Sequence, residues 1–347
     1  MKILISSDGM HAHYFQRAAW LKGFTEGGIQ TLLWDCKNTP AFDVFDTFEP
    51  DVFLGQSYNL DSALLKCIYE RPHLKVGLRA GDWGDFEHDP RFNVLHISEN
   101  EKRILEKLKK ETGKPDFVHI HYAQDAVDQA HSSYKNIGID AKSIIMCADV
   151  HEYSGASYDD SLACDIGFVG GYWPHKGIII DKYLTPMCHP VGKYNIKIFG
   201  NQPWHVNQYC GFIKDNKVKD LFKSAKVCPN LSEPHAHEYG FDINERCFKI
   251  LCAGGFCVAD NVTAIRKIFD GNGVVFAESP EDFVNKIEYY MENTEERCSL
   301  ASLGQDFVLS NHTNFHRTSE ILNLFGLQVD AAKILNKWDS IRNTANV

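Results

Sequence analysis

Short apolar runs alternate with amphipathic segments along the whole chain. Runs rich in β-branched and aromatic residues indicate strands, and apolar positions every three or four residues indicate helices. In the first half the strand-like runs are 2–6, 29–34, 51–54, 74–78, 92–97 and 116–122, and the helix-like segments lie around 13–25, 59–69 and 99–112. This alternation predicts βα repetition around a mostly parallel sheet.

The same alternation starts again after a polar, turn-rich stretch at 151–163. The second series has strand-like runs at 166–170, 195–199, 226–230, 256–259 and 273–276, and helix-like segments near 177–187, 217–225, 243–253 and 263–269. The pattern therefore predicts an α/β protein with two doubly wound sheets and a domain boundary near 150 to 165.

Composition and charge narrow the function classes. The net charge of −10 disfavours nonspecific binding of a polyanion. One basic helix is expected at 102–114, and its interspersed glutamates favour a solvated face over a nucleic-acid surface. No run of eighteen apolar residues occurs, and residues 1–9 read as a strand and a turn, so we expect a soluble, cytoplasmic protein without membrane insertion.

Cysteine and histidine spacing gives little support for a metal. The eleven cysteines are scattered, many in apolar runs, which suits reduced thiols in a core. Three His-x-His pairs, His11/His13, His119/His121 and His235/His237, would share a face if they lay on strands. No third ligand has a convincing spacing, so packing is favoured over Zn²⁺.

The segment after residue 241 predicts an anion site. Asp242 followed three residues later by Glu245 has the pattern of a capping box, which would begin a helix with its positive end facing outward. Arg246 would then lie in the first turn, where its planar guanidinium can clamp an anion. The alternative is an ordinary capped helix with a solvent-facing arginine.

Residues 244–317 carry a family resemblance. The pattern Asn244, Arg246, Phe248, Gly254 and Gly255, followed by His312-Thr313 and His316-Arg317, resembles the signature of CgeB-like, spore-maturation-type glycosyltransferases of the GT-B superfamily. The resemblance is strong over residues 164 to 325. It implies two facing Rossmann-like domains, 1–160 on the acceptor side and 161–325 on the donor side, with a closing helix in 326–347 that returns to the first domain.

The resemblance also implies a donor site with roles for particular residues. The loop Gly170, Gly171 to Lys176 is similar to the GT-B loop that meets the diphosphate, although Gly171 stands where an arginine is usual. Glu238 is similar to an acidic residue that contacts the donor sugar. Lys249 stands where related families have a ribose-binding glutamate, so the ribose is held differently or the donor is unusual.

Two loops of the first half are candidates for catalysis. Ligands of open α/β sheets bind beyond the carboxyl ends of the strands. Asp82 follows the strand at 74–78 and is our candidate general base, with His11 behind it, while Gly9 can let the main chain approach a ligand. The alternatives, in which Asp82 caps a turn and Gly9 only makes one, are equally compatible with the sequence.

Together these features predict a glycosyltransferase. The expected reaction moves a sugar from a nucleotide-diphosphate donor, most simply a UDP-sugar, to a hydroxyl of a saccharide, a protein or DNA. The nucleotide sugar is a co-substrate, and no cofactor or metal is expected, because helix ends and cations can neutralise the leaving diphosphate. Two alternatives are a DNA-modifying enzyme acting on hydroxymethylated bases of a viral genome and a non-catalytic sugar-nucleotide-binding or coat-associated protein.

Overall fold

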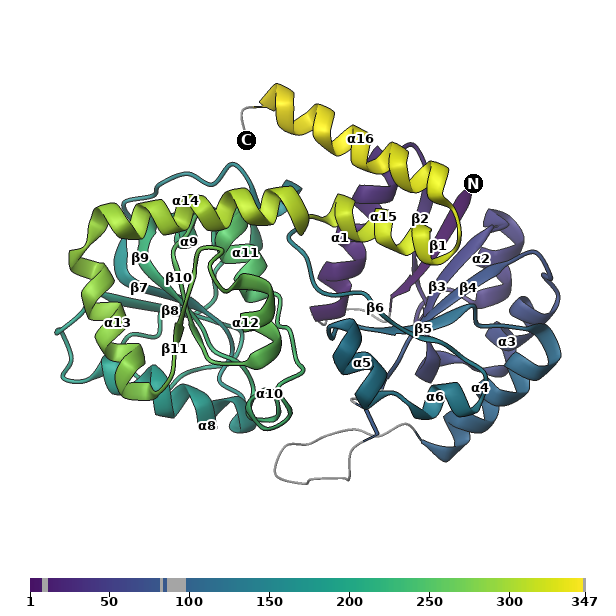
Figure 1. The fold of residues 1–347 in the computed structure, drawn as a ribbon, viewed down its shortest axis with the longest axis horizontal. Helices are drawn as coiled ribbons and strands as arrows, with labels where there is room; N and C mark the ends of the chain where they lie inside the picture. The colour runs from purple at the N-terminus through teal and green to yellow at the C-terminus, as the bar shows by residue number, and fades with distance from the viewer. Residues whose placement is uncertain (8–11, 82–83, 86–97, 346–347) are drawn as a thin grey trace. The chain divides into compact units, whose positions relative to one another are not determined.

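The computed structural model describes residues 1–347 except 8–11, 82–83, 86–97 and 346–347 (Figure 1). The chain divides into two compact units. The first unit contains residues 1–145 and 314–346, and the second contains residues 146–313. Each unit is an α/β structure built on its own parallel sheet, as the alternating pattern predicts.

The first unit has six parallel strands in the order β2-β1-β3-β4-β5-β6. These strands are β1 (Lys2–Ser7), β2 (Gln30–Asp35), β3 (Val52–Gln56), β4 (Lys75–Arg79), β5 (Phe117–Ile120) and β6 (Ala141–Ser143). The central strand β3 is buried throughout, which explains its continuous apolar sequence. The segment predicted as a strand at 92–97 lies outside the described residues.

Helices and one 3₁₀ turn connect and cover this sheet (Figure 1). Side-chain caps fix two helix starts, because Asp61 accepts from the Leu64 N–H at 2.8 Å and Ser98 accepts from the Glu101 N–H at 3.1 Å. The elements are α1 (Ala12–Glu26), α2 (Ala41–Phe48), η1 (Ser57–Asn59), α3 (Ser62–Tyr69), α4 (Glu99–Thr112), α5 (Gln124–Ala130), α6 (Ser133–Asn136), α15 (Asn314–Leu324) and α16 (Gln328–Ala345).

The second unit has five parallel strands in the order β11-β10-β9-β7-β8. They are β7 (Cys164–Val169), β8 (Ile196–Phe199), β9 (Ala225–Asn230), β10 (Cys257–Asp260) and β11 (Val274–Ala277). The surrounding elements are α7 (Val150–Tyr153), α8 (Pro174–Tyr183), η2 (Thr185–Cys188), α9 (Asp215–Ser224), α10 (Pro234–Tyr239), α11 (Arg246–Cys252), α12 (Thr263–Phe269), α13 (Pro280–Glu292) and α14 (Thr294–Asn311).

The two units are joined at different residues from those expected. The first change of unit falls after residue 145, not after 160, because α7 packs on α9 and α11, and the Ala148 N–H donates to the His312 carbonyl at 2.9 Å. The second falls after residue 313, not after 325. There α15 packs on α1, with Asn314 Nδ2 donating to the Ala19 carbonyl at 3.2 Å.

The capping box expected at Asp242 and Glu245 is wrong. The helix α11 begins at Arg246, and the Glu245 side chain makes no capping hydrogen bond. The Glu245 carboxylate instead pairs with Lys249 one turn later. The Asp242 carboxylate faces His235, at 3.8 Å from its Nε2. The Glu245 carboxylate is thus directed to a side chain and not to a main-chain N–H group.

All eleven cysteines are free thiols, and most are buried. Cys247 and Cys257 lie in the core with their sulfurs 3.9 Å apart. Burial raises the pKa of the Cys228 thiol well above its usual value, so this thiol is protonated at neutral pH. No helix in the described part of the chain is long and apolar enough to cross a membrane.

Candidate functional site

Arg246 lies at the carboxyl edge of the second sheet. Its Nε donates to the Val169 carbonyl at 3.2 Å and its Nη1 donates to the Leu231 carbonyl at 3.1 Å. The guanidinium also stands over the Phe168 ring, 4.8 Å from the centroid. The ends of β7 and β9 therefore fix the position of this cation.

The charge of Arg246 is not neutralised by a side chain. No carboxylate in the described ranges forms an ion pair with it. Burial lowers the pKa of the guanidinium below its usual value, but an arginine remains protonated at any physiological pH. A fixed, partly desolvated cation of this kind attracts an anion strongly.

The backbone around Arg246 is set by its neighbours in the chain. The Asn244 Oδ1 accepts a hydrogen bond from the Arg246 N–H at 3.1 Å, a local bond that makes a turn directly before the helix. One turn later Lys249 pairs with Glu245 and stands over the Tyr153 ring at 5.3 Å. Burial lowers the pKa of Lys249, but Glu245 and Tyr153 outweigh this effect and raise it above the usual value. Lys249 is therefore a charged part of an internal pair.

Lys176 is held by a glutamate that the sequence analysis did not single out. Its Nζ lies 2.8 Å from Glu233 Oε1, and His175 Nε2 lies 2.8 Å from Glu233 Oε2. Burial raises the pKa of Glu233, but Lys176 and His175 outweigh it and keep the pKa below its usual value. Glu233 is thus a carboxylate at neutral pH and joins the first turn of α8 to the loop after β9.

A second unpredicted carboxylate, Asp260, organises the same loop. It is fully buried at the end of β10. It accepts hydrogen bonds from the Ser232 N–H at 2.6 Å, from Ser232 Oγ at 2.9 Å and from His237 Nε2 at 2.8 Å. Ser232 directly follows Leu231, whose carbonyl holds Arg246. Asp260 therefore fixes the main chain that positions the guanidinium.

Glycines let the loop after β7 approach its neighbours closely. A Cβ at Gly170 would lie 2.8 Å from the Phe168 ring and 3.3 Å from Arg246 Nη2. A Cβ at Gly171 would lie 2.7 Å from Asn201 Oδ1. The Gly170 carbonyl accepts from Trp204 Nε1 at 2.9 Å. The structure thus brings Gly170, Asn244 and Arg246 together, while Lys176 occupies the first turn of α8 beside Glu233.

The sequence and the structure of this chain are similar to those of known glycosyltransferases. Residues 184–323 match the model of a glycosyl transferase-like family. The structure of T4 phage BGT with UDP and Mn²⁺ is 15% identical, with a TM-score of 0.58 and 100% of both chains covered. Anabaena HepE with UDP is 14% identical, with a TM-score of 0.60 over 94% of this chain and 100% of that chain. The chain has the GT-B fold.

A further solved structure has the same fold at a similarly low sequence identity. Sucrose-phosphate synthase of Thermosynechococcus elongatus is 9% identical, with a TM-score of 0.60 over 96% of this chain and 100% of its own. No curated protein matches the sequence itself. The GT-B resemblance inferred from the motif around Arg246 is confirmed at the level of the fold, and the CgeB-like subgroup stays a prediction.

Two of the predicted donor-binding glycines lie elsewhere in this GT-B unit. Gly254 and Gly255 end α11, where their N–H groups donate to the Leu251 and Ile250 carbonyls, both at 2.9 Å. Gly254 has a φ of 69°, which is the left-handed conformation of a helix C-terminus. They are at the opposite end of α11 from Arg246. The number of residues between Arg246 and Gly254 in the motif is therefore set by the length of α11.

Glu238 is exposed on α10. The three candidates of the first unit, Gly9, His11 and Asp82, lie outside the described residues. The two residues of the pair His235 and His237 do not share a face. They lie on a helix, where side chains two positions apart point to opposite sides.

In the first unit His119 is buried in β5, and the His13 ring lies 6.3 Å from the His121 ring. Burial, with further contributions from Arg79, His121, Arg17 and His119, lowers the pKa of His13 to about 2. His13 is therefore neutral at pH 7. No group of three or more potential ligands is arranged for a metal ion within the described residues.

Proposed function

We propose that this chain transfers a sugar from a nucleoside-diphosphate donor to a hydroxyl acceptor. The observation that carries the proposal is the Arg246 guanidinium, fixed by two carbonyls at the carboxyl edge of the second sheet with no ion pair in the described part of the chain. Ligands of doubly wound sheets bind at this edge. A diphosphate there would meet a positioned cation at no cost in side-chain ordering.

The proposed nucleotide is UDP. T4 phage BGT and Anabaena HepE, which share the fold, have structures with UDP and with UDP-glucose. Lys176 would be the second cation for the diphosphate. Because Glu233 holds its ammonium in this structure, donor binding would shift Lys176 or bring the diphosphate beside the Lys176–Glu233 pair.

The proposed reaction needs neither a cofactor nor a metal ion. A departing diphosphate requires positive charge, and Arg246 and Lys176 supply it from the protein. One of the T4 phage BGT structures contains Mn²⁺ beside UDP, so the metal requirement has to be measured for this chain.

We place the chain in the CgeB-like subgroup. Asn244, Arg246 and Phe248 support this assignment, since the first bonds to the Arg246 N–H, the second faces the sheet edge and the third is buried. Lys249 departs from the related families. Lys249 pairs with Glu245, a carboxylate that lies one helical turn before it and directly precedes Arg246. We propose Glu245 as the group that binds the ribose.

The acceptor hydroxyl belongs to a saccharide, a protein or a modified DNA base, with Asp82 as the proposed base and His11 as the second choice.

Incubation of the protein with UDP-glucose, UDP-galactose and UDP-N-acetylglucosamine tests whether the protein cleaves a nucleotide sugar. Slow release of UDP from at least one donor is expected, because a water hydroxyl can take the place of the acceptor hydroxyl. Tight UDP binding without turnover of any sugar nucleotide would favour a non-catalytic binding protein.

A further inference from the structure

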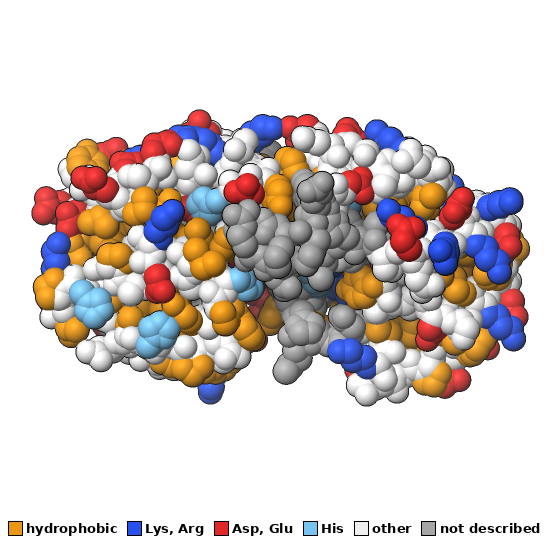
Figure 2. All heavy atoms as spheres, turned by 90° about the horizontal axis from the view of Figure 1, so that it is seen from below, with side chains coloured by type: hydrophobic (Ala, Val, Ile, Leu, Met, Phe, Trp, Pro, Cys, Tyr) orange, Lys and Arg blue, Asp and Glu red, His pale blue; other side chains and the backbone are white. Residues whose placement is uncertain are grey.

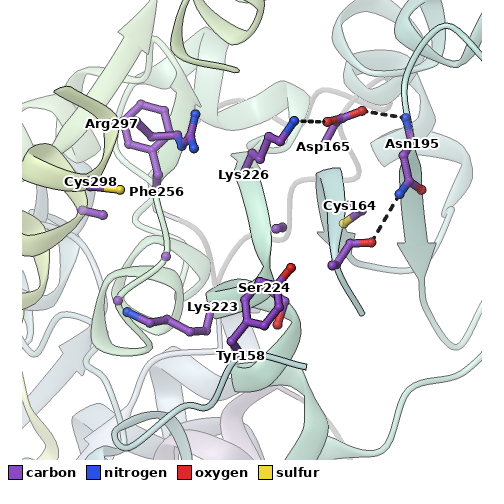
Figure 3. A pocket seen from close by; sticks show the side chains of 15 residues that line it. Tyr158, Cys164, Asp165, Asn195, Lys223, Ser224, Lys226, Phe256, Arg297 and Cys298 are labelled. Atoms are coloured by element: carbon purple, nitrogen blue, oxygen red, sulfur yellow. Dashed lines mark hydrogen bonds and ion pairs between the residues drawn. The ribbon is translucent and has the colours of Figure 1, made fainter. Parts of the chain in front are cut away.

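A cavity of about 460 Å³ opens at the amino edge of the second sheet (Figure 3). Its lining includes the first residues of β7 and β9, Cys164 and Ala225, and Phe256 just before β10. Arg246 is at the other end of the same strands. Six residues of strand separate the two edges by roughly 17 Å, so the cavity is not part of the proposed donor site.

The charge of the lining is opposite to that of the whole protein. Three cations, Lys223, Lys226 and Arg297, line the cavity against one carboxylate, Asp165. This gives a local charge of +2 in a chain with a net charge of −10. The cations come from three elements, α9, β9 and α14, which converge on one space (Figure 3).

The three cations are held in different ways. Lys226 pairs with Asp165 at 2.7 Å. Arg297 is fixed by neutral acceptors only, among them the Met291 carbonyl at 3.1 Å and Thr294 Oγ1 at 3.3 Å, so its charge is not neutralised. Lys223 has no carboxylate partner among the described residues. Two uncompensated cations therefore face the cavity.

Gly254 and Gly255 keep one wall of the cavity open. A Cβ at Gly254 would lie 2.9 Å from Lys223 Nζ, and a Cβ at Gly255 would lie 2.6 Å from the Phe222 carbonyl oxygen. The glycine pair thus lets the Lys223 ammonium lie against the end of α11. This placement gives the two glycines a role that the donor site does not use.

We infer that this cavity is a second binding site, which takes a small polyanion such as a phosphorylated metabolite. Lys223 and Arg297 would bind the anionic groups, and the exposed Tyr158 ring at the rim would cover an apolar part of the ligand. The site is separate from the proposed donor site and would serve a small anionic effector.

The reactivity of the Cys298 thiol can report whether an anion binds in the cavity. It is an exposed thiol in the lining, whereas the other exposed cysteine, Cys210, lies outside it. The full-length protein is alkylated with N-ethylmaleimide at increasing concentrations of inorganic pyrophosphate, and labelling of each cysteine is followed by mass spectrometry. Pyrophosphate is expected to slow labelling of Cys298 and leave Cys210 unchanged.

Substitutions then assign the protection. Lys223→Gln should raise the pyrophosphate concentration needed for half-protection about fivefold, the upper range for an exposed ion pair, and Lys223→Glu should raise it further. Lys214→Gln, a change of the same kind on an exposed lysine outside the lining, should have no effect, and Arg246→Ala should retain protection. Half-protection of Lys223→Gln and Lys223→Glu at the same pyrophosphate concentration as the native protein, protection lost in Arg246→Ala, or no protection of Cys298 at all would each overturn the inference.

Discussion

Asp260 organises the loop that positions Arg246 at the carboxyl edge of the second sheet. One buried carboxylate holds the Ser232 main chain, the Ser232 hydroxyl and the His237 ring. Arg246 and Lys176 can be proposed as site residues from the sequence because their motif is local. Asp260 and Glu233 could not, since their partners are chosen by the packing of separate strands and helices and leave no fixed spacing in the chain.

Replacement of Asp260 should therefore destabilise the protein. In Asp260→Ala the Ser232 and His237 donors lose a charged acceptor inside the core, and we expect a loss of about 3 kcal/mol in the free energy of unfolding. Ser232→Ala removes only the hydroxyl bond and should cost about 1 kcal/mol. Urea unfolding of both variants measures the difference. Equal small losses would show that the buried carboxylate is not an organising group.

His13 should make the first unit sensitive to mild acid. Its folded pKa of about 2 lies below the unfolded value of 6.5, so the unfolded chain binds a proton that the folded chain refuses. The contribution of neutral His13 to the free energy of unfolding is therefore fully present above pH 6.5. It decreases as the pH falls toward 2, by at most about 1.4 kcal/mol per pH unit. His13→Gln should flatten the fall between pH 6.5 and 5, which urea unfolding at a series of pH values would measure. Unchanged slopes in His13→Gln would contradict this assignment.

Many strands and helices followed the apolar pattern, but α2 and β6 had no predicted counterpart. The run at 226–230 corresponds to β9 (Ala225–Asn230), and the segment at 263–269 to α12 (Thr263–Phe269). The start of α11 was placed three residues early, because Glu245 pairs with Lys249 and makes no capping hydrogen bond, and the helix begins only at Arg246. The short helix α10 was missed, since six residues are too few for a helical period to emerge.

The glycines that end α11 give a prediction for this helix. Gly254→Ala places a side chain at a φ of 69° and should cost about 1 kcal/mol of stability. UDP affinity should not change, because the residue is at the far end of α11 from Arg246. Gly271→Ala, also at positive φ but in open space, should show a similar loss. Weaker UDP binding in Gly254→Ala would mean that the glycine pair belongs to the donor site after all.

The charges on the described part of the molecule bear on the choice of acceptor. On the face in Figure 2, acidic and basic side chains are interspersed over both units. In the basic segment at 102–114, the Lys109 ammonium donates to the Gly113 and Pro115 carbonyls at 2.9 and 3.0 Å. Lys114 is buried and bonded to the Arg71 carbonyl. These bonds suit a solvated helix and weaken the case for a DNA acceptor.

The proposed metal-free reaction is a property of the intact enzyme and can be tested on it. Release of UDP from the sugar nucleotide should continue at an unchanged rate in excess EDTA, because the cations that stabilise the leaving group belong to the protein. Added Mn²⁺ should change the rate by less than about twofold. Complete loss of turnover on chelation, with recovery on addition of Mn²⁺, would require a metal-assisted mechanism.

Titration calorimetry of UDP with the native protein and Arg246→Ala tests the donor site most directly. The native protein should bind UDP, and Arg246→Ala should bind it more weakly by about 1.5–3 kcal/mol, the range for a charge-assisted hydrogen bond. Arg246→Lys should recover only part of the loss, since an ammonium cannot reproduce the planar fork. Arg266→Ala, which removes an arginine paired with Glu278, should bind like the native protein. Equal affinity for UDP in the native protein and Arg246→Ala would contradict a diphosphate site at this arginine.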